Sequence, residues 1–154
     1  MTRRRLPVGG VQVFKTLRKE YDVYVDKTMH IYEMAEARCY QSVFLSRPRR
    51  FGKSLLCSTI DSLFRSEKEL FEGLGISKTG WEWKEHPVIH LKLGEGNYTD
   101  NGIKVLSSTL NDQLDDISNN YNSTIEKNEI ISVKFVRVIK NLCEKMGQVV
   151  IIID

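Results

Sequence analysis

The feature that most restricts the fold of this chain is a cationic, glycine-containing loop between a short apolar run and an amphipathic segment. The apolar run is residues 42–45, and after it come three arginines and a G-K-S triplet, at Arg47, Arg49, Arg50 and 52–54. Large apolar side chains then recur at the spacing of one helix face, those of Leu56, Ile60, Leu63 and Phe64. This order predicts a strand, a loop and a helix that packs against a sheet.

A loop of this kind between a strand and a helix is suited to binding phosphate. The free backbone N–H groups and the positive end of the helix dipole both favour an anion. We expect Lys53 to reach the outer phosphates, Ser54 to coordinate Mg²⁺ through its hydroxyl, and Gly52 to let the backbone approach closely. The residues predicted to bind nucleotide are Arg49, Arg50, Phe51, Gly52, Lys53, Ser54 and Leu55.

The match to the phosphate-loop motif G-x-x-x-x-G-K-[ST] is incomplete, because Arg47 occupies the first glycine position. The guanidinium groups of Arg49 and Arg50 are suited to bidentate pairing with phosphate oxygens. The same side chains are equally well explained as solvated charges of an exposed loop, so both interpretations stay open.

A second strong signal is the unbroken apolar run at 149–153, which Asp154 closes. Such a run is typical of a fully buried central strand of a parallel sheet. Asp154 at its tip is predicted to hold Mg²⁺ through the ion's water shell, opposite Ser54. An ordinary residue of a turn at the end of the strand is the alternative.

The remaining pattern alternates helices with strands and predicts an α/β parallel sheet. We expect helices at 11–20 and 28–37, a strand at 23–25 and an edge strand at 86–93. Helices are also expected through Ile103, Leu106, Leu110, Leu114 and Ile117 and through Ile131, Phe135, Val138 and Leu142, with a loop at 118–124 and Gly147 ending the last helix.

Composition sets broad limits on the class of protein. A chain of 154 residues fits one domain, and a net charge of +3 leaves a nucleic-acid partner unsupported. Three cysteines without C-x-x-C spacing do not predict a disulfide framework or a zinc site. With no signal peptide or membrane-spanning run in the sequence, we expect a cytoplasmic protein.

Several aromatic and imidazole side chains have both a structural and a functional interpretation. Trp81 and Trp83 are predicted to pack rather than to stack on a base, and His86 and His90 to be structural, because Pro87 makes their segment extended. Tyr24 either belongs to the core or stacks on an adenine.

Four strings occur in this chain in the order of a known family: L-P-V-G at 6–9, Y-V-D-K-T at 24–28, F-L-S-R-P-R-R-F-G-K-S-L at 44–55 and H-P-V-I-H-L at 86–91. Over essentially its whole length the chain resembles the AAA-ATPase-like family of microbial proteins, and R-P-R-R-F-G-K-S is the most specific part. The resemblance implies a P-loop ATPase with the same arginine-rich loop. It also implies that a nuclease-like domain follows in many members.

On this resemblance, residues 1–154 form the N-terminal portion of one P-loop ATPase-like domain. Residues 1–41 are expected to be a helical and strand extension, and 42–154 the core through the Walker B strand. Family members continue past this aspartate, so we expect ATP and Mg²⁺ binding without efficient hydrolysis, and self-association or poor solubility. No catalytic residue is assigned. The alternative function is a non-hydrolysing nucleotide-sensing or assembly module, associated with nucleic acid.

Overall fold

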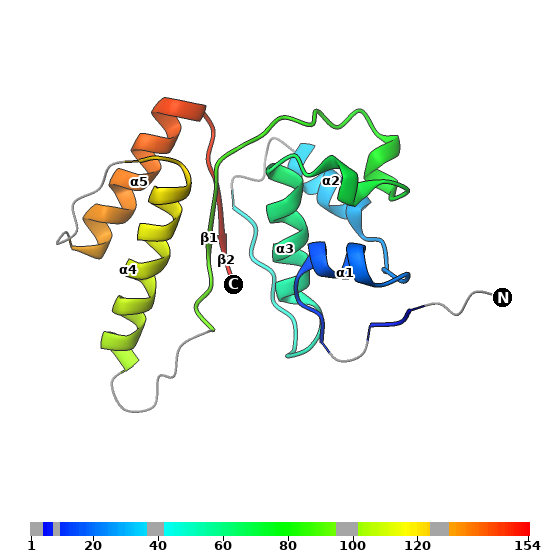
Figure 1. Ribbon diagram of the computed structural model, residues 1–154, viewed down its shortest axis with the longest axis horizontal. Coiled ribbons are helices and arrows are strands. Elements are labelled where there is room, and N and C mark those ends of the chain that lie inside the picture. Colours follow the sequence, from blue (N-terminus) through cyan, green and yellow to red (C-terminus); the bar gives the residue numbers. More distant parts are fainter. Residues whose placement is uncertain (1–4, 8–9, 37–41, 95–101, 124–129) are drawn as a thin grey trace. The chain divides into compact units, whose positions relative to one another are not determined.

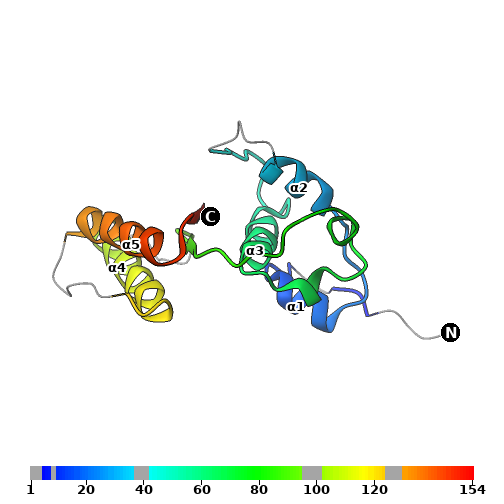
Figure 2. The ribbon, with the colours of Figure 1, turned by 90° about the horizontal axis from the view of Figure 1, so that it is seen from above.

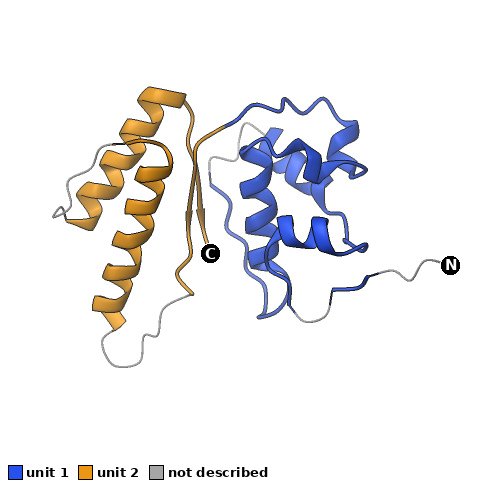
Figure 3. Ribbon diagram, in the orientation of Figure 1, with its two compact units in different colours: residues 1–85 blue, residues 86–154 orange. Residues whose placement is uncertain are grey.

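The computed structural model describes residues 5–7, 10–36, 42–94, 102–123 and 130–154 (Figure 1). The chain divides into two compact units, residues 1–85 and 86–154, which Figure 3 shows in different colours. Unit 1 contains α1 (Phe14–Glu20), α2 (Thr28–Glu36), α3 (Lys53–Phe64) and the short 3-10 helices η1 (Lys68–Phe71) and η2 (Gly75–Lys78). Unit 2 contains β1 (Val88–Leu91), α4 (Gly102–Asn120), α5 (Ile131–Met146) and β2 (Val150–Ile153).

The core of unit 1 forms where α1, α2 and α3 bury one apolar face each, together with η1 and η2. Its fully or nearly fully buried members are Phe14, Ile31, Leu63, Leu70, Phe71, Leu74 and Ile76. Of the predicted face of α3, Leu63 is buried, and Leu56 and Ile60 pack against the same cluster. The helix predicted after the cationic loop is therefore confirmed with its core-facing side, and Figure 2 shows α1 and α2 beside it from above.

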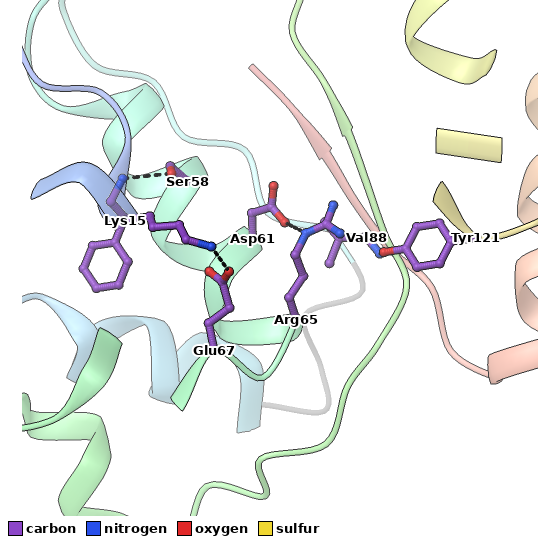
Figure 4. A network of polar contacts seen from close by, with 8 residues as sticks. Lys15, Ser58, Asp61, Arg65, Glu67, Val88 and Tyr121 are labelled. Carbon is purple, nitrogen blue, oxygen red and sulfur yellow. Dashed lines mark hydrogen bonds and ion pairs between the residues drawn. The ribbon is translucent and has the colours of Figure 1, made fainter. Parts of the chain in front are cut away.

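Two polar contacts from α1 hold α3 in unit 1, one at the middle of α3 and one just beyond its end (Figure 4). The backbone N–H of Phe14 donates to Ser58 Oγ at 3.0 Å, so the first residue of α1 is fixed to the middle of α3. Lys15 Nζ lies 2.9 Å from Glu67 Oε1, just beyond the end of α3. The pKa of Lys15 is raised by its hydrogen bond to Glu67 and by the negative charge of that carboxylate.

The V-D-K-T string forms a cap at the start of α2. Asp26 accepts hydrogen bonds from the N–H and the hydroxyl of Thr28, at 2.8 and 2.7 Å. Its second oxygen accepts the N–H of Gly75 at 2.7 Å, and the buried Thr28 Oγ1 accepts the N–H of Ile76 at 3.1 Å. Two side chains thus join the beginning of α2 to η2, almost fifty residues later in the sequence.

Two strands predicted for unit 1 are not formed. Residues 23–25 and 42–45 are extended but belong to no sheet, and Phe44 is 93% exposed. An apolar segment becomes a strand only when a neighbouring strand completes its hydrogen-bond ladder, and among the described residues only β1 and β2 pair. The prediction of a strand before the cationic loop is therefore wrong for this structure.

Unit 2 is built from two long amphipathic helices, which run in roughly the same direction, beside a small sheet (Figure 1). Its core contains Ile89, Leu91, Leu114, Ile117, Val138 and Leu142. Most of the predicted inward faces of both helices are confirmed, but Ile103 is exposed, and Leu106 is half-buried outside the core cluster. The helix α4 continues through 118–120, where a loop was predicted, because the buried Ser118 hydroxyl donates to the Ser123 carbonyl of the following turn. Thr124, the end of that predicted loop, lies outside the described residues.

An ion pair between a buried lysine and a partly exposed aspartate joins the two helices of unit 2. Lys134 of α5 is only 1% exposed, and its ammonium group lies 2.8 Å from Asp115 Oδ1 of α4. A second contact reaches Asn111 Oδ1 at 3.3 Å. A buried lysine needs such partners, because an uncompensated charge in the interior is costly.

The sheet of unit 2 is two-stranded and parallel, with Ile89 paired to Ile151 and Leu91 to Ile153. Strand β1 is largely buried, whereas Ile151 and Ile153 of β2 are 44% and 62% exposed. The prediction that 149–153 is a fully buried central strand is therefore wrong: burial depends on what covers each face, and α4 and α5 cover mainly the β1 side chains. At the end of α5, Gly147 adopts the expected positive φ, 85°.

The fold is thus a mixture of helices with a small parallel sheet, compatible with the α/β class. The boundary predicted at residue 41 falls within 37–41, outside the described residues, and the single-domain scheme stays a prediction. Within the described part of the chain, no helix is long and apolar enough to cross a lipid bilayer.

Candidate functional site

The cationic loop enters α3 through a glycine in the left-handed region. Gly52, the residue before Lys53, has φ 74° and ψ 25°, a conformation that costs other residues about 1 kcal/mol or more. It offers no side-chain cap to α3, and the first bond of the helix runs from the N–H of Leu56 to the Gly52 carbonyl at 3.0 Å. The N–H groups of the first turn therefore need partners from elsewhere, as a phosphate could provide.

The side chain of Lys53 folds back over the loop that precedes it. Its ammonium nitrogen lies 2.7 Å from the carbonyl oxygen of Arg47 and 3.3 Å from that of Pro48. An ammonium group has three donors, so these two contacts leave one for a further oxygen. The backbone of the loop thus holds the ammonium group of Lys53 beside the loop itself.

Arg47, Arg49 and Arg50 are exposed, and within the described residues none of the three guanidinium groups is paired with a carboxylate. Arg50 adopts φ 66°, which is uncommon for a residue with a side chain. A loop that carries this much unneutralised positive charge at a helix N-terminus is electrostatically complementary to a polyanion. Phe51, between the arginines and Gly52, is 63% exposed.

Ser54 and Asp154, the predicted magnesium ligands, belong to different units. Ser54 lies half-buried in the first turn of α3, directly after Lys53. Asp154 follows β2, and its backbone continues the ladder by donating to the Leu91 carbonyl at 2.9 Å. A hydroxyl and a carboxylate are the hard oxygen donors that Mg²⁺ prefers, so the two side chains fit the ion by chemistry.

The aromatic residues with two interpretations are partly buried and pack against the core of unit 1. Trp81 packs edge-on against Phe64 at 5.6 Å between ring centroids, and Trp83 lies 5.4 Å from Phe71, which confirms the packing prediction for both. Tyr24 packs edge-on against Phe14 at 5.2 Å. Burial raises the pKa of its hydroxyl, although a hydrogen bond with Thr59 opposes the shift.

Two features of the loop were not predicted from the sequence. The partners of Lys53 are backbone carbonyls, which carry no sequence signal, and the positive φ of Arg50 falls on a residue type that does not favour it. His86, predicted to be structural, has its Nδ1 3.3 Å from the Gln148 carbonyl.

Comparison with known proteins adds two findings. A family model described as "Predicted AAA-ATPase" matches residues 7–154. An "Uncharacterized protein in vnfD 5′region" of Azotobacter chroococcum mcd 1 is 42% identical over 98 residues, which are 62% of this chain and 18% of that protein. The chain therefore corresponds to less than a fifth of the length of this relative. No solved structure matches the chain.

Proposed function

The chain belongs to the AAA-ATPase-like family, and from this premise we propose that it is a P-loop domain that binds a nucleoside triphosphate, with ATP as the first candidate. The proposed phosphate site is the loop and the first turn of α3: Arg49, Arg50, Phe51, Gly52, Lys53, Ser54 and Leu55. Arg49, Arg50 and Lys53 supply positive charge, and the first-turn N–H groups supply hydrogen-bond donors.

The observation that carries this proposal is the entry into α3 at Gly52. Its left-handed conformation turns the chain into the helix without a capping side chain, so the N–H groups of Lys53, Ser54 and Leu55 remain for a ligand. The ammonium of Lys53 is already at the same turn, held by the carbonyls of Arg47 and Pro48. A triphosphate would replace these weak acceptors with charged oxygens.

Magnesium belongs to the same proposal. When bound, it would neutralise part of the triphosphate charge, with Ser54 as a direct ligand and Asp154 acting through the water shell. The role of Asp154 is drawn from its position at the end of β2 and from the acidic residue that P-loop ATPases carry there. Self-association is also proposed, since Ile151 and Ile153 expose apolar surface on β2.

The proposal is tested by titrating the chain with ATP and MgCl₂ in a calorimeter, beside the Lys53→Ala variant. Loss of one direct charge contact to phosphate should weaken binding by about 2 kcal/mol, roughly thirtyfold. Lys19→Ala is the matched control, because Lys19 is an exposed lysine of unit 1 outside the loop. Omitting MgCl₂ should weaken binding by the wild type but have little effect in a Ser54→Ala variant.

Turnover is measured separately, as phosphate release by the longest available version of the protein. Phosphate release that Lys53→Ala abolishes would support an ATPase, whereas ATP binding without release would favour a nucleotide-sensing or assembly module. Equal affinity of the wild type, Lys53→Ala and Lys19→Ala for ATP would contradict the proposed phosphate site.

A further inference from the structure

Unit 1 contains a cavity of about 440 Å³ beside the cationic loop. Its walls come from the extended segment around Tyr24 and Val25, from Leu45 and Phe51 before α3, and from Gly52 and Leu55 at the start of α3. The lining is mostly apolar, and the volume lies in the range of about 300 to 1,000 Å³ that is usual for small-molecule sites.

Apolar side chains at this cavity are exposed to an unusual degree. Val25 is 72% exposed, Leu45 37% and Phe51 63%, although all three line the same hollow. Unit 1 has a buried apolar core, formed by the residues of its core cluster. The exposure of Val25, Leu45 and Phe51 is therefore not explained by the absence of a core to pack against. An apolar, concave surface left open in this way is typical of a binding site.

The cavity also contains a few polar groups that could set the orientation of a ligand. Tyr24 and Thr59 are among its lining residues, and Thr59 Oγ1 donates to the Leu55 carbonyl at 2.8 Å. Lys27 and His30, at the start of α2, contribute a cationic and an imidazole side chain. This combination of apolar walls with a few hydrogen-bonding groups is suited to a flat heteroaromatic ring, which needs contact on its faces and partners at its edge.

The position of the cavity indicates which kind of heteroaromatic ring it binds. Gly52 and Leu55 belong both to its wall and to the turn that is proposed to bind the phosphates, and Arg47, whose carbonyl holds Lys53, lines it too. A ligand that fills the cavity and also reaches the N-terminus of α3 must carry an apolar ring at one end and negative charge at the other. We propose that this cavity holds the base of the bound nucleotide, an inference that rests on the proposed function.

The test compares ATP with inorganic tripolyphosphate, each with MgCl₂, by calorimetry on the 154-residue chain. Both ligands carry the phosphate chain, but only ATP carries a base. The first variant is Val25→Trp, which places a large ring at the rim of the cavity. Val43→Trp is its matched control, because Val43 is also exposed but does not line the cavity.

We expect Val25→Trp to weaken ATP binding about tenfold, which corresponds to about 1.4 kcal/mol, and to leave tripolyphosphate binding unchanged. Val43→Trp should leave both affinities unchanged. Phe51→Ala, which removes an exposed ring from the cavity wall, should also weaken ATP more than tripolyphosphate, and it decides the question if Val25→Trp does not fold.

The experiment distinguishes failure of the proposed function from failure of the inference about the cavity. If the wild type binds neither ATP nor tripolyphosphate, the proposed function itself is wrong. If the wild type binds both, and Val25→Trp and Phe51→Ala change the two affinities by the same factor, the phosphate site stands and the base lies elsewhere, which overturns the inference about the cavity.

Discussion

Replacing Thr28 by valine removes a hydroxyl from a fully buried position at almost constant volume. That hydroxyl donates to Asp26 Oδ1 at 2.7 Å and accepts the N–H of Ile76 at 3.1 Å. A hydrogen bond to an ionised carboxylate contributes about 1.5 to 3 kcal/mol, and a buried N–H left without an acceptor costs about 1 to 3 kcal/mol. Because Asp26 is exposed and can be rehydrated, we expect Thr28→Val to lower the free energy of unfolding by about 2 to 4 kcal/mol.

The matched variant is Thr28→Ser, which keeps both hydrogen bonds and removes only a buried methyl group. It should cost about 1 kcal/mol. Urea unfolding followed by circular dichroism gives both free energies, and amide hydrogen exchange at Ile76 gives a local measure of the same contact. The order of the two stabilities is informative, because valine would be the more stable replacement if only apolar packing mattered at this position. If Thr28→Val were as stable as Thr28→Ser, the reasoning about this cap would be refuted.

Three further perturbations test other parts of the structure. Burial raises the pKa of Asp26, but hydrogen bonds from Gly75 and Thr28 together outweigh it, so that the pKa is lowered from the ordinary value of 3.8. The ionised carboxylate therefore stabilises the fold at pH values above 3.8. In urea titrations, the difference in unfolding free energy between wild type and Asp26→Asn should shrink as the pH falls below 3.8. Gly52→Ala should cost about 1 to 2 kcal/mol in thermal melts because its φ is positive, whereas Gly80→Ala, at an unstrained and open position, should cost little; equal costs would count against strain at Gly52. Lys134→Ala should destabilise unit 2 by about 3 kcal/mol in urea because it empties the space of a buried side chain, while Lys134→Met, which fills the same space without a charge, should be near neutral; the reverse order would contradict the account of the Lys134–Asp115 pair.

The sequence predicted those elements whose determinants are local. The helix after the loop was recognisable because Leu56, Ile60 and Leu63 repeat at helical spacing, and that spacing needs no knowledge of the rest of the chain. The G-K-S triplet at 52–54 is recognisable for the same reason, since the triplet and the helix that follows it are adjacent in sequence. Its role in binding phosphate stays a prediction. Gly147 was likewise readable from its position after an amphipathic segment.

Features that depend on distant partners were not predicted. Residues 42–45 look like a strand in isolation, yet a strand requires a neighbour, and the described residues supply none for them. The apolar run of β2 does not reveal that Ile151 and Ile153 are exposed, because exposure depends on which helices cover the sheet. The V-D-K-T string gave no hint of its role, since the partner amides belong to Gly75 and Ile76.

The distribution of the two tryptophans gives the chain a built-in optical reporter. Trp81 and Trp83 are its only tryptophans, and both lie among the aromatic rings of unit 1. Intrinsic fluorescence therefore reports melting of the half that carries the cationic loop, whereas ellipticity reports the helices of both units. A midpoint that differs between the two signals in one titration would therefore show, without any label, that the half with the tryptophans melts apart from the rest of the helices.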